Sequence, residues 1–260
     1  MSTALVIGGA SGIGKATARE LYSAGHRVVI ADVDAEAART TAVEIGAGEA
    51  GAGDAGGTVE SIHLDVTDES SVAAGFEGLD DLAVVVNCAG LSMPGALIEL
   101  ELAAWRTTVD VCLTGTFLVL KHAGRRLIEG GSIVCVASLN GRQPGAGMGS
   151  YCAAKAGVLM LVEVAALELA DRGIRVNAVS PGLVDTPLTA GIAYVPGLTE
   201  EYLENTPLGR AGTPEDVAET ITFLTSSAAG WMTGAAIDLN GGAHLKRYPD
   251  VLGRVRALAQ

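Results

Sequence analysis

Apolar residues along the chain gather in short runs that alternate with longer stretches of helical periodicity. Several runs are apolar at every position, which is typical of parallel strands that are covered on both faces. We expect strands at Ala4–Ile7, Arg27–Ala31, Thr58–Leu64, Leu82–Val86, Ser132–Val136, Ile174–Val179 and Ala236–Leu239. We expect helices at Gly12–Ser23, Ala35–Ile45, Ser70–Phe76, Glu101–Ile128, Tyr151–Asp171 and Pro214–Ser226. This alternation predicts an α/β fold in three layers, with a doubly wound parallel sheet and right-handed crossovers.

Two segments fall outside this alternation. Gly46–Gly57 contains six Gly, four Ala and two acidic residues, which predicts a flexible surface loop before the third strand. Ala243–Gln260 combines apolar and basic residues, which predicts a short amphipathic helix on its own subunit or a segment that packs across a subunit boundary. Nothing else resembles a linker, so we expect a single domain over residues 1–242, with 243–260 as its C-terminal tail.

The composition excludes several classes of protein. The chain of 260 residues is 49% hydrophobic, which is too apolar for a disordered protein, and its formal net charge of −13 argues against a nucleic-acid surface. The sequence contains neither an apolar run of membrane-spanning length nor a signal peptide, so we expect a cytoplasmic protein without membrane contact. The cysteines lie in apolar stretches without metal-ligand spacing, which predicts reduced, buried thiols and no metal site. They are Cys88, Cys112, Cys135 and Cys152.

A glycine-rich turn follows the first expected strand and opens the first expected helix. Gly8, Gly12 and Gly14 would let the backbone turn tightly and approach a pyrophosphate. The N-terminus of the helix would then offer unpaired N–H groups to that anion. The pattern therefore predicts a dinucleotide site, although a tight turn without a ligand would explain the glycines as well.

Asp32 ends the second expected strand, 18 positions after Gly14. A carboxylate at this place can accept both hydroxyls of a ribose, and it repels a 2′-phosphate. Neither Ser11 nor Val33 is basic, so nothing beside Asp32 favours that phosphate. The site is therefore expected to prefer NAD to NADP. The alternative role of a helix cap suits Asp34 better than Asp32.

Three further polar residues fall at the same predicted edge of the sheet. Tyr151 and Lys155 are four positions apart in an expected helix, so they share one face. Ser138 follows the strand Ser132–Val136, whose carboxyl end meets the ligand crevice of a parallel sheet. The tyrosine–lysine spacing is common by itself, and the serine together with the glycine turn makes it specific.

These residues make the chain similar to the short-chain dehydrogenase/reductases, in the branch with the GxxxGxG and YxxxK motifs. The resemblance extends from Ala4 to about Gly242 and implies a Rossmann-type fold. Further matching segments are Asp65, Asn87–Gly90, Pro181–Gly182, Thr186, Gly209–Arg210, Pro214–Ala218, Thr233–Gly234 and Asn240–Gly242. The cofactor-binding residues that the resemblance implies are Gly8, Ser11, Gly12, Ile13, Gly14, Asp32, Val33, Asp65, Val66, Asn87, Ala89, Gly90, Tyr151, Lys155, Pro181, Gly182, Val184 and Thr186.

The resemblance also implies an activity, the NAD(H)-dependent interconversion of a secondary alcohol and a ketone. The nicotinamide carries the hydride, while Tyr151 is the general acid for reduction and the general base for oxidation. Lys155 binds the nicotinamide ribose and favours the phenolate form of the tyrosine. Ser138 hydrogen-bonds the substrate oxygen as charge develops on it.

Two residues depart from the family pattern. Ile7 replaces the usual threonine before the first glycine, so we expect the turn to be held by other groups. Cys112 replaces the usual asparagine, which kinks the helix and helps to hold a water that relays protons to the lysine. Cysteine bonds such a water poorly, so we expect a weaker relay or one held by a backbone carbonyl.

The region Pro187–Thr206 is rich in apolar residues and corresponds to the mobile lid of the family, although an amphipathic surface helix would look the same. Its character predicts a hydrophobic small-molecule alcohol or ketone as substrate. Asn140, Gln143 and Met148 flank the expected site and are candidates for substrate contact. The family also implies a homo-oligomer, with a tetramer favoured.

Two alternative functions stay open. A 3-oxoacyl-carrier-protein reductase would use Arg125, Arg126 and Arg172 to receive an acidic carrier, although cations at helix ends explain these residues too. A cofactor-binding sensor or regulator would have lost catalysis, which the cysteine at position 112 favours weakly and the intact Ser138, Tyr151 and Lys155 oppose.

Overall fold

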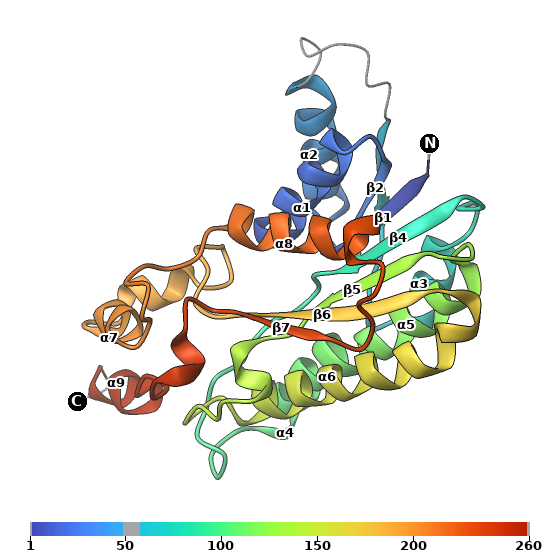
Figure 1. The fold of residues 1–260 in the computed structure, drawn as a ribbon. Helices are drawn as coiled ribbons and strands as arrows, with labels where there is room; N and C mark the ends of the chain where they lie inside the picture. The colour runs from blue at the N-terminus through green and yellow to red at the C-terminus, as the bar shows by residue number, and fades with distance from the viewer. Residues whose placement is uncertain (1, 49–57, 259–260) are drawn as a thin grey trace.

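Seven parallel strands form one sheet in the computed structural model, which describes residues 2–48 and 58–258. Their order is β3-β2-β1-β4-β5-β6-β7, so the chain winds outward on both sides of the β1–β4 pair (Figure 1). The strands are β1 (Thr3–Ile7), β2 (Arg27–Asp32), β3 (Val59–His63), β4 (Leu82–Asn87), β5 (Ser132–Val136), β6 (Arg175–Pro181) and β7 (Ala236–Leu239). The predicted doubly wound sheet is confirmed, and its winding reverses at the place where such sheets bind ligands.

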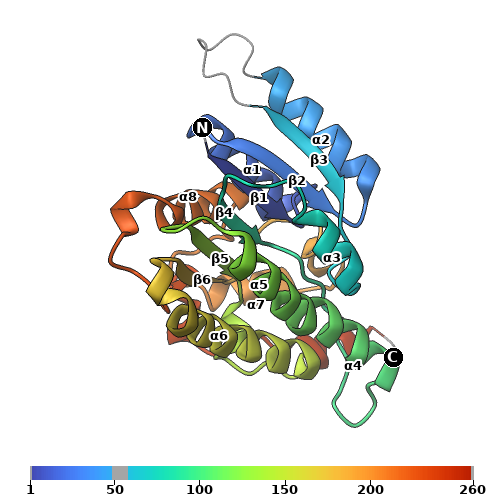
Figure 2. The same ribbon diagram turned by 90° about the vertical axis from the view of Figure 1, so that its right-hand side faces the viewer.

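Helices cover both faces of this sheet (Figure 1 and Figure 2). One face carries α1 (Gly12–Ser23), α2 (Ala35–Gly48) and α8 (Pro214–Thr225). The other carries α3 (Glu69–Gly75), α5 (Gly115–Arg126) and α6 (Gly149–Leu169), with α4 (Leu102–Val109) beside α6.

Strand β1 shows why the central strands are apolar at every position. Leu5 and Ile7 belong to the core cluster formed with α5 and α6, whereas Ala4 and Val6 belong to the cluster formed with α1 and α8. A fully buried Leu, Ile or Val side chain contributes about 1.5–3 kcal/mol. Burial on both faces therefore stabilises the strands that carry the candidate site at their carboxyl ends.

The single helix predicted at Glu101–Ile128 is wrong, because the structure interrupts it. α4 ends at Val109, a π-helical turn spans Asp110–Thr114, and α5 begins at Gly115. A π turn keeps the chain helical and inserts no polar break, so the apolar periodicity continues through it. The pattern of residue types therefore could not reveal the interruption.

The loop predicted at Gly46–Gly57 begins later than expected, because α2 continues to Gly48, and residues 49–57 lie outside the described part of the chain. The predicted lid region contains a 3₁₀ turn (Ala190–Tyr194) and α7 (Leu198–Glu204), and the tail contains α9 (Val251–Ala257). These two helices lie side by side beyond one end of the sheet (Figure 1). The tail thus folds against α7 of its own chain.

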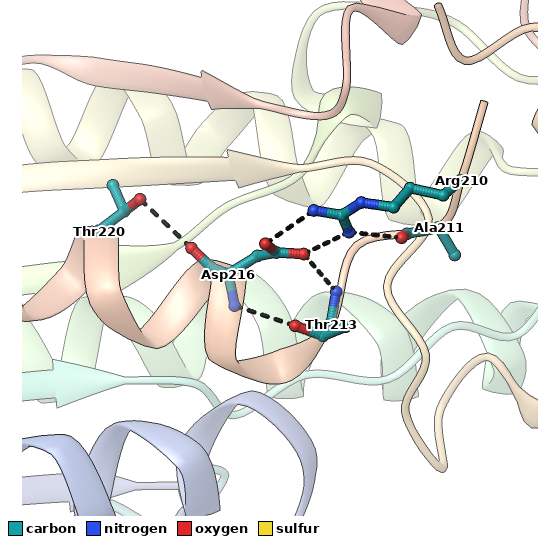
Figure 3. Close-up of polar contacts among 5 residues, drawn as sticks. All are labelled: Arg210, Ala211, Thr213, Asp216 and Thr220. Carbon is teal, nitrogen blue, oxygen red and sulfur yellow. Dashed lines mark hydrogen bonds and ion pairs between the residues drawn. The ribbon is translucent and has the colours of Figure 1, made fainter. Parts of the chain in front are cut away.

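A hydrogen-bonded cluster surrounds the start of α8 (Figure 3). The Asp216 carboxylate accepts the Thr213 N–H at 2.7 Å and both terminal nitrogens of Arg210, at 2.6 and 2.9 Å. In return, the Asp216 N–H donates to the Thr213 hydroxyl at 3.1 Å, which completes a capping box. The Gly212 N–H donates to the Leu183 carbonyl at 2.9 Å, so the cluster also holds the segment that follows β6.

Replacing Asp216 with alanine is expected to lower the unfolding free energy by about 1 kcal/mol, the usual value of a lost helix cap. Arg210→Ala removes an exposed ion pair and an exposed hydrogen bond to the Ala211 carbonyl, and it is expected to cost less, roughly 0–1 kcal/mol. Urea unfolding of the wild type and both variants measures this order, and a larger cost for Arg210→Ala would contradict it.

The same residue should make stability depend on pH. The Arg210 guanidinium and the Thr213 N–H hold the pKa of Asp216 well below its ordinary value of 3.8. A lowered folded-state pKa stabilises the fold above the unfolded value, and this stabilisation is lost as the pH falls toward the folded value. The difference in stability between wild type and Asp216→Ala is therefore expected to shrink below about pH 4. An equal difference at neutral and acidic pH would count against this assignment.

Candidate active site

The turn after β1 is tight enough to require glycine. Gly8 and Gly12 have φ angles of +72° and +49°, in the left-handed region that other residues avoid. A Cβ at Gly14 would lie 2.0 Å from the Gly8 carbonyl oxygen, because α1 starts directly against the turn. Among the described residues, the Ser11 side chain caps none of the first N–H groups of α1. These groups remain available to an anion.

Side chains from β2 and α2 hold the turn. The Ala10 N–H donates to the Asp32 carboxylate at 3.0 Å, and the Thr41 hydroxyl donates to the Ala10 carbonyl at 3.0 Å. Ile7 is buried in the apolar core, so the polar contacts come from elsewhere, as its departure from the family pattern predicts. The other oxygen of Asp32 accepts the Asp34 N–H at 3.1 Å, while Asp34 itself caps α2.

A cavity of about 550 Å³ opens over the turn and extends along the carboxyl ends of β1 to β4. The predicted cofactor residues in its lining are Gly8, Ser11, Gly12, Ile13, Gly14, Asp32, Val33, Asp65, Val66, Ala89, Gly90 and Thr186. Glycines that a Cβ would block, free N–H groups and a fixed carboxylate fit a dinucleotide, with the pyrophosphate at the turn and a ribose at Asp32. The Thr67 hydroxyl and N–H hold the pKa of Asp65 below its ordinary value.

Six predicted cofactor residues lie outside this lining, namely Asn87, Tyr151, Lys155, Pro181, Gly182 and Val184. Asn87 is buried, and its amide donates to the Thr116 hydroxyl at 3.0 Å. Val184 is also buried and lines a separate small hollow beside α8. A cofactor contact of Asn87 or Val184 would therefore use its backbone, and both contacts stay predictions.

Ser138, Tyr151 and Lys155 come together at the carboxyl end of β5. Tyr151 lies in the first turn of α6, and the Lys155 ammonium lies 5.6 Å from the centre of its ring. Lys155 is buried, and its Nζ donates to the Val136 carbonyl at 2.7 Å, which replaces part of the lost hydration. A Cβ at Gly90 would lie 3.4 Å from the same nitrogen, so Lys155 reaches the edge of the glycine-lined cavity.

The Ser138 hydroxyl has a defined hydrogen-bonding role. It accepts the Asn140 N–H at 3.1 Å, at the start of a 3₁₀ turn (Leu139–Gly141). A hydroxyl that accepts in this way keeps its own O–H free to donate. Ser138 is thus prepared to donate a hydrogen bond into the space in front of Tyr151.

That space is a second cavity, of about 340 Å³, which adjoins the first because Leu188 lines both. Ser138 and Tyr151 line it, as do the predicted cofactor residues Pro181 and Gly182. The lid region, α7 and the tail supply most of the remaining wall, which is mainly apolar. The described lining contains no charged side chain. The arrangement places a proton donor and a hydroxyl at one end of an apolar chamber beside the glycine turn.

The geometry has close counterparts among known proteins. A solved short-chain type dehydrogenase/reductase from Mycobacterium ulcerans matches with a TM-score of 0.93 at 36% identity, over 99% of this chain and 94% of that one. The family model described as enoyl-(acyl carrier protein) reductase matches residues 8–244. The chain belongs to the short-chain dehydrogenase/reductase family.

Named members of the short-chain dehydrogenase/reductase family are similar over nearly their whole length. A cis-4-hydroxycyclohexanecarboxylate dehydrogenase of Sinomonas cyclohexanicum is 45% identical, over 92% of this chain and 95% of that protein. The 2,5-dichloro-2,5-cyclohexadiene-1,4-diol dehydrogenase LinX of Sphingobium indicum is 39% identical, over 92% of this chain and 94% of that protein. A solved structure from Agrobacterium tumefaciens with NADP bound is 32% identical with a TM-score of 0.85, over 94% of this chain and 97% of that one.

Cys112, which stands where the short-chain dehydrogenase/reductases usually have asparagine, occupies the π turn. Its Sγ donates to the Leu91 carbonyl at 3.2 Å and lies 3.5 Å from the Leu91 N–H. Its own carbonyl accepts the Thr116 hydroxyl at 2.7 Å. The interruption of the helix thus persists without asparagine, and the thiol ties the π turn to the backbone just after Gly90.

The other cysteines match the expected chemistry only in part. All four thiols are free, but Cys88 and Cys152 are half-buried rather than buried. Desolvation raises the pKa of the Cys88 and Cys135 thiols to about 12, which keeps them protonated and unreactive. Across the described chain, no cluster of three or more His, Cys, Asp or Glu suits a metal, and no helix is long and apolar enough to cross a bilayer.

Sequence reasoning missed part of the substrate cavity. The tail residues Tyr248, Val251 and Val255 line it, beside Tyr202 of the lid region, which is expected to lie over the substrate. Asn140 and Met148 line it as expected, whereas the Gln143 amide turns away and donates to the Lys246 carbonyl at 2.6 Å. The lid and tail residues carried only an apolar pattern, which did not show that they meet over Tyr151.

Proposed function

We propose that this enzyme interconverts an apolar secondary alcohol and its ketone with NAD as the cofactor, and that Tyr151 transfers the proton. Membership of the family already makes it an oxidoreductase of secondary alcohols and ketones that uses a nicotinamide cofactor. The observation that carries the proposal is the placement of Ser138 and Tyr151 in an apolar cavity that adjoins the glycine-lined cavity at Leu188.

Three side chains have separate roles around the reacting carbon. A bound nicotinamide supplies the hydride acceptor for alcohol oxidation and the hydride donor for ketone reduction. The Tyr151 phenol takes a proton from the alcohol oxygen or returns one to the ketone oxygen. The free O–H of Ser138 donates to that same oxygen, which stabilises its developing charge. The Lys155 ammonium, fixed by the Val136 carbonyl, supports the phenolate and faces the cofactor side.

Asp32 supports the choice of NAD. Two backbone N–H groups fix its carboxylate in the lining of the cofactor cavity, at 3.0 and 3.1 Å. A fixed carboxylate accepts ribose hydroxyls and repels a 2′-phosphate. Its neighbour in the lining, Val33, offers no positive charge to offset that repulsion.

The uncharged, mainly apolar lining of the second cavity supports a small apolar substrate. The alicyclic substrates in the names of the two relatives agree with this class. The carrier-protein alternative receives less support, because the Arg172 guanidinium donates to the Gly124 and Leu127 carbonyls at the end of α5. One of the three basic residues is thus occupied as a helix cap.

We also propose a homo-oligomer, with a tetramer favoured, in the cytoplasm. Helices α5 and α6 support the oligomer because they expose apolar side chains at Phe117, Met160, Val164 and Leu167. Burial of such side chains between subunits is a common source of stability in homo-oligomers. Light scattering after size-exclusion chromatography tests the oligomer, and a monomer at micromolar concentration would contradict it.

The experiment that tests the function is a screen for NADH formation, followed at 340 nm, across cyclic secondary alcohols, steroids and 3-hydroxyacyl thioesters. We expect turnover with cyclic alcohols and NAD, and the reverse reaction with the matching ketones and NADH. Turnover confined to acyl thioesters would favour the reductase alternative. Cofactor binding without turnover of any class would favour the sensor.

A further inference from the structure

Two tyrosines that have no part in the proton transfer meet in the wall of the substrate cavity. Tyr202 comes from α7, and Tyr248 comes from the tail just before α9. Their hydroxyl oxygens are 2.9 Å apart, and their rings pack edge to face at 5.9 Å between centres. They place a polar point in a lining that is otherwise mostly apolar.

The direction of the hydrogen bonds at this point follows from the number of protons available. The Asn140 amide nitrogen donates to the Gln143 carbonyl at 3.1 Å, which leaves the Asn140 side-chain oxygen as an acceptor. The Tyr248 O–H donates to that oxygen at 3.0 Å. A phenol has only one proton, so the bond between the two tyrosines must use the proton of Tyr202.

Both phenol protons are therefore committed inside the protein. The Tyr202 oxygen has only lone pairs left for the cavity. This point of the wall can therefore accept a hydrogen bond but cannot donate one. Burial raises the pKa of both phenols above their ordinary values, so both remain neutral over the working range of the enzyme. A neutral acceptor suits a hydroxyl group, and it repels the oxygens of a carboxylate.

An ion-pair cluster around the buried Glu201 carboxylate holds the elements that carry the two tyrosines, although its arginines are exposed. Glu201, next to Tyr202, is buried and accepts the Asp250 N–H at 3.1 Å and Nε of Arg254 at 3.1 Å. Arg247 lies 3.2 Å from the same carboxylate. These contacts connect α7 with residues on both sides of Tyr248, so the lid and the tail hold the acceptor point together. Such prior ordering lowers the entropic cost of recognising a ligand.

We propose that Tyr202, held by Tyr248, is a specificity-determining residue that accepts a hydrogen bond from a second hydroxyl of the substrate. The substrate class is then a neutral diol or hydroxyketone, with one oxygen at Ser138 and Tyr151 and the other at Tyr202. This inference rests on the proposed function, because it assumes that the cavity holds an alcohol. The inference predicts that the enzyme prefers a diol to a hydroxy acid, because the described lining has no cation to pair with a carboxylate.

The test compares cyclohexanol with 1,4-cyclohexanediol and 4-hydroxycyclohexanecarboxylate as probes, with NAD present. Per reacting hydroxyl, we expect kcat/KM of the wild type to be about five- to tenfold higher for the diol than for cyclohexanol, the value of one hydrogen bond. Tyr202→Phe should bring this ratio close to one. Tyr194→Phe is the matched control, because Tyr194 lies in the lid region but is exposed and outside the lining, and its ratio should equal that of the wild type.

Tyr248→Phe is expected to change the substrate preference in another direction. It removes the acceptor of the Tyr202 proton, so Tyr202 can donate into the cavity, and the preference should move from the diol toward 4-methoxycyclohexanol. A change in the ratio is informative even where folding suffers, because both probes report on the same folded fraction.

Two readouts keep the inference separate from the proposed function. Kd values of the probes for the enzyme–NAD complex, from intrinsic fluorescence, give the same preference without turnover. Equal Kd values for cyclohexanol and the diol, a preference for the carboxylate, or an unchanged ratio in Tyr202→Phe would overturn the inference. Tight, diol-selective binding without NADH formation would overturn the proposed function and leave the recognition point standing.

Discussion

Tyr151→Phe is expected to lower kcat by about 10²- to 10⁴-fold, the usual contribution of a general acid or base. Phenylalanine keeps the ring in the wall of the substrate cavity but removes the phenol that we propose as donor and acceptor of the substrate proton. Binding of NAD is expected to stay within about twofold of the wild type, because the described lining of the glycine-rich cavity does not include Tyr151.

Initial rates of NADH formation and a titration with NAD, followed by intrinsic fluorescence, measure the two quantities separately. Tyr194→Phe, at an exposed position of the lid region, controls for loss of a tyrosine hydroxyl as such. Turnover retained within tenfold in Tyr151→Phe would show that another group moves the proton, and the assignment of Tyr151 would then fall.

Asp32→Asn is expected to reduce the preference for NAD over NADP, as a ratio of kcat/KM values, by about 100-fold or more. The repulsion between a fixed carboxylate and a 2′-phosphate is worth several kcal/mol, and the amide removes it. KM for NAD should rise as well, because two N–H groups converge on this side chain and an amide offers only one acceptor oxygen to them.

Asp34→Asn supplies the matched control two residues away. Its carboxylate caps α2 and lies outside the described lining of the cofactor cavity, so its cofactor preference should match that of the wild type. If the wild type already prefers NADP, or if Asp32→Asn leaves the ratio unchanged, the choice of NAD would be overturned.

The sequence predicts those parts of the fold in which the type of each residue depends on its own burial or its own backbone conformation. The continuous apolar run of β1 predicts burial on both faces of the sheet. The glycines of the turn predict a backbone in which a Cβ atom would clash with its neighbours. Ser138, Tyr151 and Lys155 are predicted from their strand and helix positions together with the glycine turn, and the family resemblance supplies their roles. Local signals of this kind can be interpreted without knowledge of tertiary contacts.

The parts that sequence does not predict depend on long-range partners. Nothing around Tyr248 indicates Asn140, which lies 108 positions earlier, or Tyr202, which lies 46 positions earlier. Glu201 is one acidic residue among several in the lid, and only the fold brings Arg254 and the Asp250 N–H onto it. The π turn is a change in hydrogen-bond register, so the apolar periodicity shows no trace of it, and only the family resemblance places a helix kink at position 112.

The two adjoining cavities draw on different parts of the chain. The cofactor cavity is lined by residues up to Val111 and by Thr186–Leu188, whereas the substrate cavity is lined, apart from Ser92 and Pro94, by residues from Ser138 onward. Mutations in α7 and the tail can therefore change the substrate cavity without altering the residues that line the cofactor cavity.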